Sequence, residues 1–242
     1  MDELERYLRQ IGIKGFGKGA QRRLERSAVL VAGAGGLGTS ASVYLAAAGV
    51  GKLTLVDSGK VEPSNLNRQI LHWESDIGAP KVRSAARKLR CLNPSVEVEG
   101  VERGISEENV EGLVKKADVV VDGLDNYRTR FILNEACVRF GVPMVHGAVE
   151  GLDGQVTTIL PGKGPCLRCI IPKEPGQKGE IPVLGPVPGM IGCAQAMEAI
   201  KLITGLGVPL VGRMLILSGR EMNFEEIEVR RDPGCAVCGG KR

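Results

Sequence analysis

Short apolar runs alternate with amphipathic segments through the first half of the chain. Runs of apolar residues at 27–32, 52–57, 96–101, 118–122 and 143–147 predict five strands. Helical spacing of apolar positions predicts helices at 39–48, 81–92, 106–116 and 126–140. A charged, amphipathic segment at 3–26 also has helical character and is broken by Gly15, Gly17 and Gly19. Strands and helices that alternate at this spacing predict a parallel, doubly wound sheet.

The pattern changes after residue 147. Residues 154–160 and 213–231 are strand-rich and suggest antiparallel pairing, and a long apolar helix is predicted between them at 189–204. Residues 173–188 are rich in Pro and Gly without periodicity, which predicts a crossover loop. We therefore predict an α/β fold with a Rossmann-like, mostly parallel sheet and an antiparallel C-terminal extension.

A glycine-rich segment directly follows the first predicted strand. Residues 33–38 read Gly-Ala-Gly-Gly-Leu-Gly, which places Gly-x-Gly-x-x-Gly between a strand and a helix. There the backbone can approach a phosphate, and the helix N-terminus supplies free N–H donors. Asp57 ends the second strand, where an acid can accept hydrogen bonds from ribose hydroxyls. The pattern predicts a nucleotide on Gly33, Gly35, Gly36 and Gly38, with a tight structural turn as the alternative.

Charged residues beyond this segment bear on which nucleotide is bound. Arg68 and Lys81 are two cations after the loop, and Asp125 comes at the carboxyl end of the fourth predicted strand. Ligands of open α/β sheets bind at those strand ends. Cations with an acid suit a triphosphate and Mg²⁺, which is held by one or two carboxylates and phosphate oxygens. We therefore expect ATP and Mg²⁺, and an NAD-dependent oxidoreductase is the alternative.

Two Cys-x-x-Cys pairs lie far apart in the chain. Cys166 and Cys169 follow a Gly-Pro turn, and Cys235 and Cys238 follow a Pro-Gly turn. Four thiolates at this spacing match a tetrahedral zinc site, and four sulfurs close the coordination shell. We therefore predict a structural Zn²⁺ that clips the C-terminus onto the middle of the fold. Two unrelated redox or incidental pairs are the alternative.

Composition narrows the class of protein. The net charge of +4 is too small to indicate nucleic acid by itself. The N-terminus shows no signal peptide, and no apolar stretch approaches the roughly 20 residues of a membrane span. We expect a cytoplasmic protein without membrane or nucleic-acid partners. The other cysteines, Cys91, Cys137 and Cys193, are expected to be reduced core residues.

Three further polar residues are expected to be structural. The only two histidines, His72 and His146, are interpreted as groups with satisfied hydrogen bonds. Asp122 is interpreted as structural rather than catalytic. The histidines and the unpaired cysteines give no evident Cys–His dyad.

Several motifs together resemble the ThiF/MoeB/HesA family, the prokaryotic relatives of ubiquitin-activating enzymes. Residues 6–10 resemble its Arg-Tyr-x-Arg-Gln, residues 33–38 its Gly-x-Gly-Gly-Leu-Gly, and residues 64–69 its Ser-Asn-Leu-x-Arg-Gln. Residues 79–81, 125–130 and 195–201 and the two cysteine pairs follow in order. The match is best with MoeB-type adenylyltransferases. It implies one domain over 1–242, with a nucleotide-binding half at 1–147 and a carrier-binding, zinc-clipped half at 148–242.

The resemblance implies a reaction. The C-terminal Gly-Gly carboxylate of a ubiquitin-like sulfur carrier, similar to MoaD or ThiS, attacks the α-phosphate of ATP, and pyrophosphate leaves. An α-carboxyl group, with a pKa near 3.5, is already ionised at pH 7, so no general base is needed. The enzyme must hold two anions in line and offset the developing charge. Whether the carrier serves molybdopterin, thiamine or tRNA thiolation stays open.

The resemblance also implies roles for individual residues. Asp57 holds the ribose, Asp125 holds Mg²⁺, and Asn65 and Asn126 join the nucleotide site. Arg9 reaches the triphosphate of the neighbouring subunit, which implies a homodimer. The implied catalytic set is Arg9, Arg68, Lys81 and Asp125.

The residues alone leave other interpretations open. Arg9 could be a solvated helix residue, and Asn65 could belong to a turn. Arg68 and Lys81 could be surface charges. Asp125 could cap the helix that follows it, because Asp is a preferred N-cap residue.

One departure from the family pattern concerns the crossover loop. Many relatives carry a cysteine there that can link covalently to the carrier, whereas residues 173–188 contain none and Lys178 falls near that position. Cys193 in the apolar helix is a poor substitute because buried thiols are inert. We therefore expect adenylation only, with sulfur from a separate protein such as a cysteine desulfurase or rhodanese. A non-catalytic scaffold and a tRNA-modifying or peptide-adenylating enzyme are further alternatives.

Overall fold

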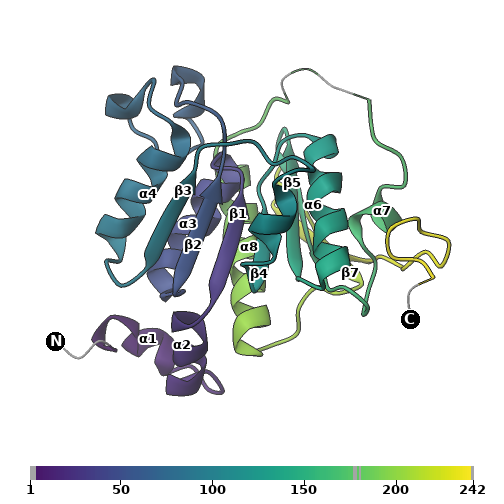
Figure 1. Cartoon of the computed structure of the whole chain (residues 1–242), viewed down its shortest axis with the longest axis horizontal. Helices are drawn as coiled ribbons and strands as arrows, with labels where there is room; N and C mark the ends of the chain where they lie inside the picture. Colours follow the sequence, from purple (N-terminus) through teal and green to yellow (C-terminus); the bar gives the residue numbers. More distant parts are fainter. Residues whose placement is uncertain (1–3, 177–178, 180, 241–242) are drawn as a thin grey trace.

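The computed structural model describes residues 4–176, 179 and 181–240, and it contains one eight-stranded sheet between two layers of helices (Figure 1). The strand order is β3-β2-β1-β4-β5-β6-β7-β8. Adjacent strands from β3 to β5 are parallel, and those from β5 to β8 are antiparallel. The strands are β1 (Ala28–Ala32), β2 (Lys52–Val56), β3 (Glu97–Val101), β4 (Val119–Asp122), β5 (Met144–Glu150), β6 (Asp153–Ile159), β7 (Arg213–Ser218) and β8 (Asn223–Glu228).

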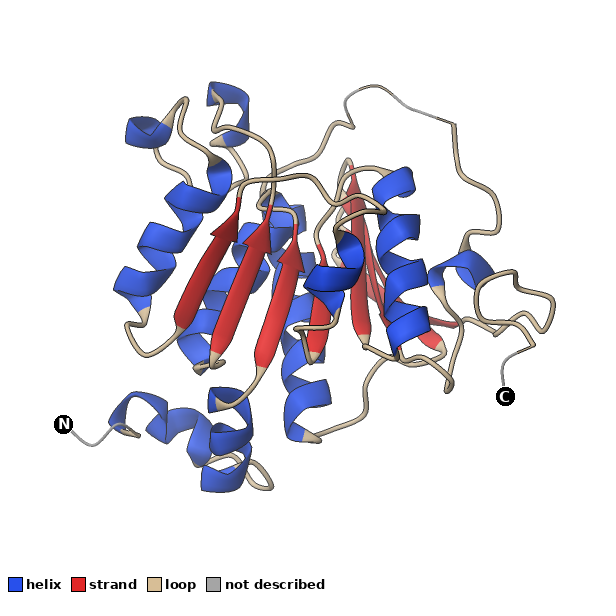
Figure 2. Cartoon of the chain, in the orientation of Figure 1, coloured by secondary structure: helices blue, strands red, loops and turns tan. Residues whose placement is uncertain are grey.

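Helices cover both faces of the sheet (Figure 2). The larger core lies under α2 (Gly17–Glu25), α3 (Gly36–Ala48), α4 (Lys81–Leu92) and α8 (Pro186–Thr204). The other face is covered by α5 (Val110–Val114), α6 (Tyr127–Phe140) and α7 (Leu167–Ile170). No helix in the described part of the chain is both long and apolar enough to span a bilayer. The predicted α/β fold with an antiparallel extension is confirmed.

Several predicted boundaries were wrong for identifiable reasons. The segment 3–26 divides into η1 (Glu5–Tyr7), α1 (Leu8–Ile11) and α2, and Gly19 lies inside α2 rather than breaking it. The helix expected at 106–116 is only α5, because the Asn109 side chain accepts from the Ser106 N–H at 3.0 Å and forms a turn. Helix α8 begins earlier than 189, at Pro186, since proline suits the first helical position.

Close backbone packing joins α8 to α3. A Cβ atom at Gly192 of α8 would lie 2.6 Å from the Leu37 carbonyl oxygen and 2.7 Å from Ser40 Cβ. At the start of the two helices, a Cβ at Gly36 would lie 2.9 Å from Pro188 Cβ. The end of the crossover segment therefore sits directly on the glycine-rich turn after β1.

A buried ion pair attaches the segment between β2 and α4 to α4. Asp76 and Lys88 are both buried and form a salt bridge, and Arg87 also pairs with Asp76, at 2.6 Å. Lys88 Nζ donates to the Leu71 carbonyl at 2.6 Å, and the Trp73 N–H donates to Asp76 at 2.8 Å. This segment, which carries Asn65 and Arg68, is thereby fixed to α4.

We predict that Asp76→Asn lowers the free energy of unfolding at pH 7 by about 3 kcal/mol, because the buried Lys88 ammonium loses its anion. Burial alone would raise the pKa of Asp76, but Lys88, the Trp73 N–H and Ser84 lower it to about 2 from an ordinary 3.8. With a depressed pKa, the carboxylate's contribution is complete above pH of about 4 and is lost as the pH falls through about 2.

Urea unfolding of wild type and Asp76→Asn from pH 7 to pH 2 tests this. The difference in free energy of unfolding between the two proteins should stay constant from pH 7 to about pH 4 and decrease at lower pH. Glu74→Gln, a change at an exposed carboxylate two residues away, is the matched control and should stay within about 0.5 kcal/mol of wild type. A difference that is constant down to pH 2 would contradict the assignment.

Candidate functional site

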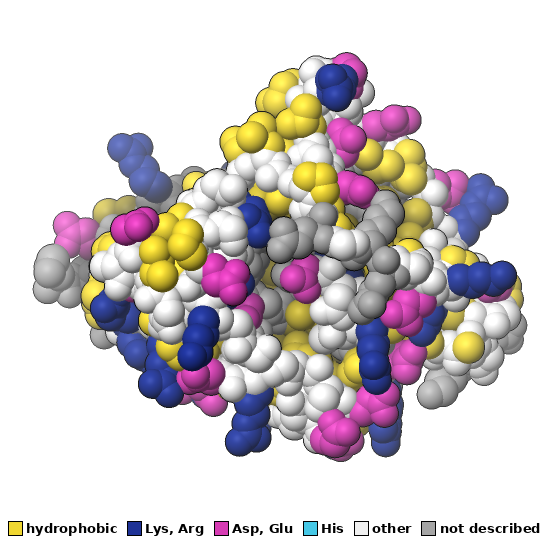
Figure 3. Space-filling model, turned by 90° about the horizontal axis from the view of Figure 1, so that it is seen from above, with side chains coloured by type: hydrophobic (Ala, Val, Ile, Leu, Met, Phe, Trp, Pro, Cys, Tyr) yellow, Lys and Arg dark blue, Asp and Glu magenta, His cyan; other side chains and the backbone are white. Residues whose placement is uncertain are grey.

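The predicted nucleotide-binding residues gather where three neighbouring strands end. The glycine turn follows β1, Asp57 follows β2, and Asp125 lies in the turn after β4. Because β1 lies between β2 and β4 and all three are parallel, these turns share one edge of the sheet. Figure 3 looks onto this edge and shows a hollow in the surface beside the crossover segment. This is the crevice in which open α/β sheets bind ligands.

The glycines of the turn serve two different purposes. A Cβ at Gly38 would lie 1.8 Å from the Gly33 carbonyl oxygen, and one at Gly33, where φ is +96°, would lie 2.6 Å from the Gly123 carbonyl oxygen. These two positions require glycine for backbone packing. Gly35 is different, because the nearest atom to its Cβ position is Gln69 Nε2 at 3.9 Å. Space therefore remains at Gly35 for a ligand to approach the backbone.

Asp57 contacts the glycine turn directly. Its Oδ2 accepts from the Ala34 N–H at 2.8 Å, and its Oδ1 accepts from the Gly59 N–H at 2.7 Å. The carboxylate is half-buried. Each oxygen retains a lone pair for a further donor, which is compatible with ribose hydroxyls.

Asp125 does not cap the helix that follows it. The Asn126 side chain is the N-cap of α6 and accepts from the Thr129 N–H at 2.9 Å. Asp125 stays exposed, and its Oδ1 accepts only a long contact of 3.3 Å from Asn126 Nδ2. The capping interpretation of Asp125 is therefore wrong, and its carboxylate is available at the strand edge.

The other predicted residues differ in their surroundings. Arg68 is half-buried, and its Nη1 donates to the Ser64 carbonyl at 2.8 Å. Lys81 is half-buried at the first position of α4, and its N–H donates to the Gly59 carbonyl at 3.0 Å. Within the described ranges neither forms an ion pair, so both cations remain available to an anion. Asn65 is buried in a turn, where its Oδ1 accepts from the Glu62 N–H at 3.1 Å.

Arg9 lies apart from the rest of the set. It is exposed on α1, which lies near the N-terminal ends of β1–β3, opposite the edge with the glycine turn (Figure 1). The structure brings together Asp57, the glycine turn, Lys81, Arg68 and Asp125 around one edge, but it does not bring Arg9 of the same chain to it.

A buried polar network lies beneath this edge, and sequence analysis missed it. Asp122 Oδ2 lies 2.7 Å from His146 Nδ1 and 3.6 Å from Arg130 Nε, and all three side chains are buried. Burial alone would raise the pKa of Asp122, but Arg130 and His146 keep it below its usual value. Gln195 Nε2 donates to the Asp122 carbonyl at 2.7 Å and to the Val145 carbonyl at 3.1 Å. The one possible clue to this network was the expected pairing of β4 with β5, which places Asp122 beside His146.

Both histidines are buried, but only one is fully satisfied. His72 has partners within 3.0 Å at both ring nitrogens. His146 Nε2 has no hydrogen-bond partner among the described residues, so its predicted satisfaction is only half correct. Cys137 is buried as expected, whereas Cys91 is exposed and Cys193 is half-buried, so those two are not core residues.

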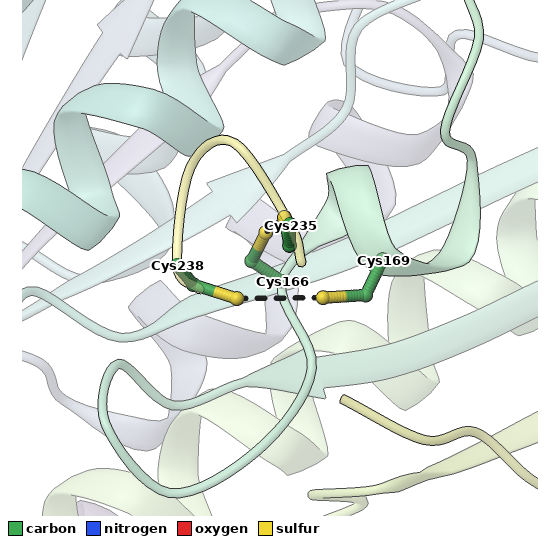
Figure 4. A group of neighbouring side chains, drawn as sticks. All are labelled: Cys166, Cys169, Cys235 and Cys238. Atoms are coloured by element: carbon green, nitrogen blue, oxygen red, sulfur yellow. Dashed lines mark hydrogen bonds between the residues drawn. The ribbon is translucent and has the colours of Figure 1, made fainter. Parts of the chain in front are cut away.

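The four paired cysteines form one cluster (Figure 4). Their sulfur atoms all lie within 4.8 Å of one another, with Cys166–Cys235 at 3.6 Å and Cys169–Cys238 at 3.3 Å. A tetrahedron with Zn–S bonds of about 2.3 Å requires sulfur separations of about 3.8 Å. The Asp232 N–H also points to Cys169 Sγ at 3.4 Å. The cluster fits a closed four-sulfur metal site between α7 and the C-terminal segment.

Comparisons with known proteins agree with this arrangement. The SAMP-activating enzyme E1 of Haloferax volcanii is 47% identical over 98% of this chain and 89% of its own length. The sulfur carrier protein adenylyltransferase of Thermus thermophilus is 42% identical over 98% of this chain and 92% of its own length. Both relatives therefore match nearly end to end.

A solved structure shows the same fold. The chain superposes on E. coli MccB, crystallised with MccA-N7isoASN, with a TM-score of 0.88 and 25% identity over 99% of this chain and 76% of MccB. A crystal structure of MccB with ATP also matches, with a TM-score of 0.82 and 25% identity over 92% of this chain and 69% of that one. The ThiF family model matches residues 7–237, and the chain belongs to the ThiF family.

Proposed function

We propose that this protein uses ATP to adenylate the C-terminal Gly-Gly carboxylate of a ubiquitin-like sulfur carrier. The main support is the match to two relatives over nearly the full length of each chain. Their names describe activation of SAMP and adenylylation of a sulfur carrier. The gathering of the glycine turn, Asp57, Arg68, Lys81 and Asp125 around one sheet edge supports it.

The reaction needs positioning and charge more than proton transfer. A carrier carboxylate oxygen attacks the α-phosphorus of ATP, the bond from that phosphorus to the bridging oxygen breaks, and pyrophosphate leaves. No proton moves, because the carboxylate is already ionised. The site must therefore hold two anions in line and stabilise the charge on the phosphates.

Each residue of the edge has a part in this proposal. Asp57 accepts from the ribose hydroxyls, and the backbone at Gly35 meets the phosphates. Arg68 and Lys81 offset phosphate charge, with Asn65 holding the turn that carries Arg68. Asp125, next to Asn126, would hold Mg²⁺, which when bound neutralises phosphate oxygens.

The second half of the chain is proposed to bind the carrier. Residues 148–242 contain the antiparallel extension, the crossover segment and the cysteine cluster. The residues of this segment at 177, 178 and 180, including Lys178, lie outside the described part. Because 173–188 contains no cysteine, the adenylate would pass to a separate sulfur donor, such as a cysteine desulfurase or rhodanese. The chemistry defines the carrier as a compact protein with a flexible Gly-Gly tail.

A homodimer would complete the site. Tyr44 of α3 is 54% exposed and Met197 of α8 is 59% exposed, so each of these helices presents a large side chain to solvent. Tyr7 packs against Gly49 at the end of α3, so α1, which carries Arg9, begins beside that helix end. A second copy seated on α3 and α8 would bury Tyr44 and Met197 and carry its Arg9 toward the partner's triphosphate.

We predict that Asp125→Ala reduces carrier-dependent ATP–pyrophosphate exchange by at least about 10²–10³-fold while leaving the fold intact. The physical reason is the loss of the metal-binding carboxylate at the strand edge. Exchange is measured with Mg²⁺ and a carrier ending in Gly-Gly, and a carrier lacking the last glycine shows the background. Glu25→Ala, at an exposed carboxylate at the end of α2 and close to the opposite end of β1, is the control and should behave as wild type. Near-normal exchange in Asp125→Ala would refute its role.

We also predict that Arg9→Ala and Asp125→Ala are each inactive alone but complement one another. In a dimer of one copy of each, one site keeps Asp125 and receives Arg9 from the other copy. Random pairing should then restore about a quarter of the wild-type exchange rate. Co-expression with two affinity tags measures this. If the mixed dimers stay inactive while Arg9→Ala dimers bind ATP normally, Arg9 does not act across the interface.

We propose that Zn²⁺ occupies the cysteine cluster in a structural role. Cys238→Ser should lower zinc content and the melting temperature strongly, since structural zinc is worth on the order of 10 kcal/mol in small metal-binding domains. Metal analysis and thermal unfolding test this, with Cys91→Ser at an exposed thiol outside the cluster as the control. An unchanged melting temperature with lost activity would mean that the metal is not structural.

A second adenylating activity is distinguishable by the same assay. The alternative is adenylation of a peptide, and E. coli MccB, on which this chain superposes, was crystallised with MccA-N7isoASN. Exchange that is independent of any Gly-Gly carrier and appears only with peptide substrates would support it. Nicotinamide binding without ATP dependence would instead indicate an oxidoreductase.

A further inference from the structure

The segment before α4 contains a buried histidine in direct contact with the glycine turn. His72 is 3% exposed, and its Nε2 lies 3.0 Å from the Ala34 carbonyl oxygen. Its Nδ1 lies 3.0 Å from Ser84 Oγ on α4. The imidazole therefore connects the turn after β1 to α4, which begins with Lys81.

The partners of the ring settle which nitrogen carries the proton. A carbonyl oxygen only accepts, so Nε2 must donate to Ala34. Burial first, and then the positive charges of Lys81 and Lys88, lower the pKa of His72, so the ring is neutral at pH 7. Nδ1 of a neutral ring then accepts from the Ser84 hydroxyl.

Ser84 is itself oriented by the buried ion pair. Lys88 Nζ donates to Ser84 Oγ at 2.9 Å, which uses an oxygen lone pair. Of the two acceptors that the Ser84 hydroxyl can reach, His72 Nδ1 at 3.0 Å is nearer than the Leu71 carbonyl oxygen at 3.3 Å. Lys88 also pairs with Asp76. Contacts that run from Asp76 through Lys88 and Ser84 to His72 therefore favour the tautomer in which Nε2 donates to the Ala34 carbonyl.

The consequence falls on the next peptide group. In a planar trans peptide, the carbonyl of Ala34 and the N–H of Gly35 point in opposite directions. His72 holds the carbonyl toward the protein interior, and Asp57 holds the N–H of Ala34 itself at 2.8 Å. The Gly35 N–H is therefore turned away from His72, and it has no hydrogen-bond partner in the described part of the chain. A Cβ at Gly35 would meet no atom closer than 3.9 Å, so a ligand has room to approach the backbone at this residue.

We propose that His72 is a positioning residue that orients the Gly35 N–H toward a phosphate of the nucleotide. The proposal rests on the function proposed above, because it requires that ATP bind at this turn. Held in advance, the donor costs no reorganisation when the anion arrives. His72 does not touch the substrate and takes no part in proton transfer.

The chain provides its own internal control for the proton assignment. It contains only two histidines, and His146 faces the Asp122 carboxylate through Nδ1 at 2.7 Å. A carboxylate only accepts, so Nδ1 of His146 carries the proton. Nitrogen-15 NMR of the imidazoles should therefore show opposite neutral tautomers, with Nε2–H at His72 and Nδ1–H at His146. An Nδ1–H tautomer at His72 would overturn the proposal.

The second test measures affinity for Mg²⁺-ATP without carrier by calorimetry. We expect His72→Phe to weaken ATP binding about tenfold, with carrier affinity unchanged. His72→Gln, whose amide can donate to the Ala34 carbonyl, should recover most of the loss. The matched control is Thr157→Val, which removes a buried hydroxyl on β6 whose proton lies between the Leu210 and Arg213 carbonyls. It should lower the melting temperature but leave ATP affinity unchanged.

The outcomes separate the two proposals. If His72→Phe loses stability as Thr157→Val does but binds ATP as wild type does, His72 is merely structural and the proposal fails. If the wild type binds no ATP, the proposed function fails first. Should His72→Phe not fold, Ser84→Ala keeps the imidazole but removes the donor to Nδ1 together with the acceptor of Lys88 Nζ. An ATP affinity equal to that of the wild type in this variant would also overturn the positioning role.

Discussion

The nucleotide edge depends on one close contact between two backbone turns. The turn after β1 and the turn after β4 meet at Gly33 and Gly123, where a Cβ on Gly33 would lie 2.6 Å from the Gly123 carbonyl oxygen. On the other side, the Cβ position of Gly38 falls 1.8 Å from the Gly33 carbonyl oxygen. No side chain fits between these segments, so α3 begins directly against the turn that leads to Asp125. The shared edge of the site follows from this contact.

Polar groups then restrain the backbone of the turn, which glycine alone would leave conformationally variable. Glycine gives the turn its conformational range, and range alone would allow the backbone donors to point in many directions. The Ala34 N–H is held by Asp57 after β2, while Gln195 of α8 holds the carbonyl of Asp122 at the end of β4. The restraints come from separate elements, so the site is formed before any ligand binds. Such preorganisation is what a reaction between two anions requires, because the chemistry itself needs no proton transfer.

The sequence predicted the architecture well and the short-range geometry less well. Strand–helix alternation and the glycine pattern identify β1, α3 and the position of Asp57, because both signals are local. Asn126 as the cap of α6 was not predicted, since Asp and Asn are both preferred caps and only the backbone shows which one accepts from Thr129. The exposure of Cys91 was missed because an amphipathic helix places residues on a solvent face that a composition argument ignores. Asp122 and His146 are 24 residues apart, so their contact depends on the pairing of β4 with β5 and not on a local pattern.

The cysteine cluster joins the C-terminal segment to the smaller core. All six residues of β8 are exposed, so this edge strand contributes little to either core. The chain after β8 returns to α7 through Cys235 and Cys238, which are buried against Cys166 of the smaller core. A metal bound by four sulfurs would supply a cross-link that the apolar contacts of this edge cannot supply. The chain therefore combines two kinds of close contact: glycine packing at the nucleotide edge, and a cluster of four cysteines, suited to a metal, that joins the segment after β8 to α7.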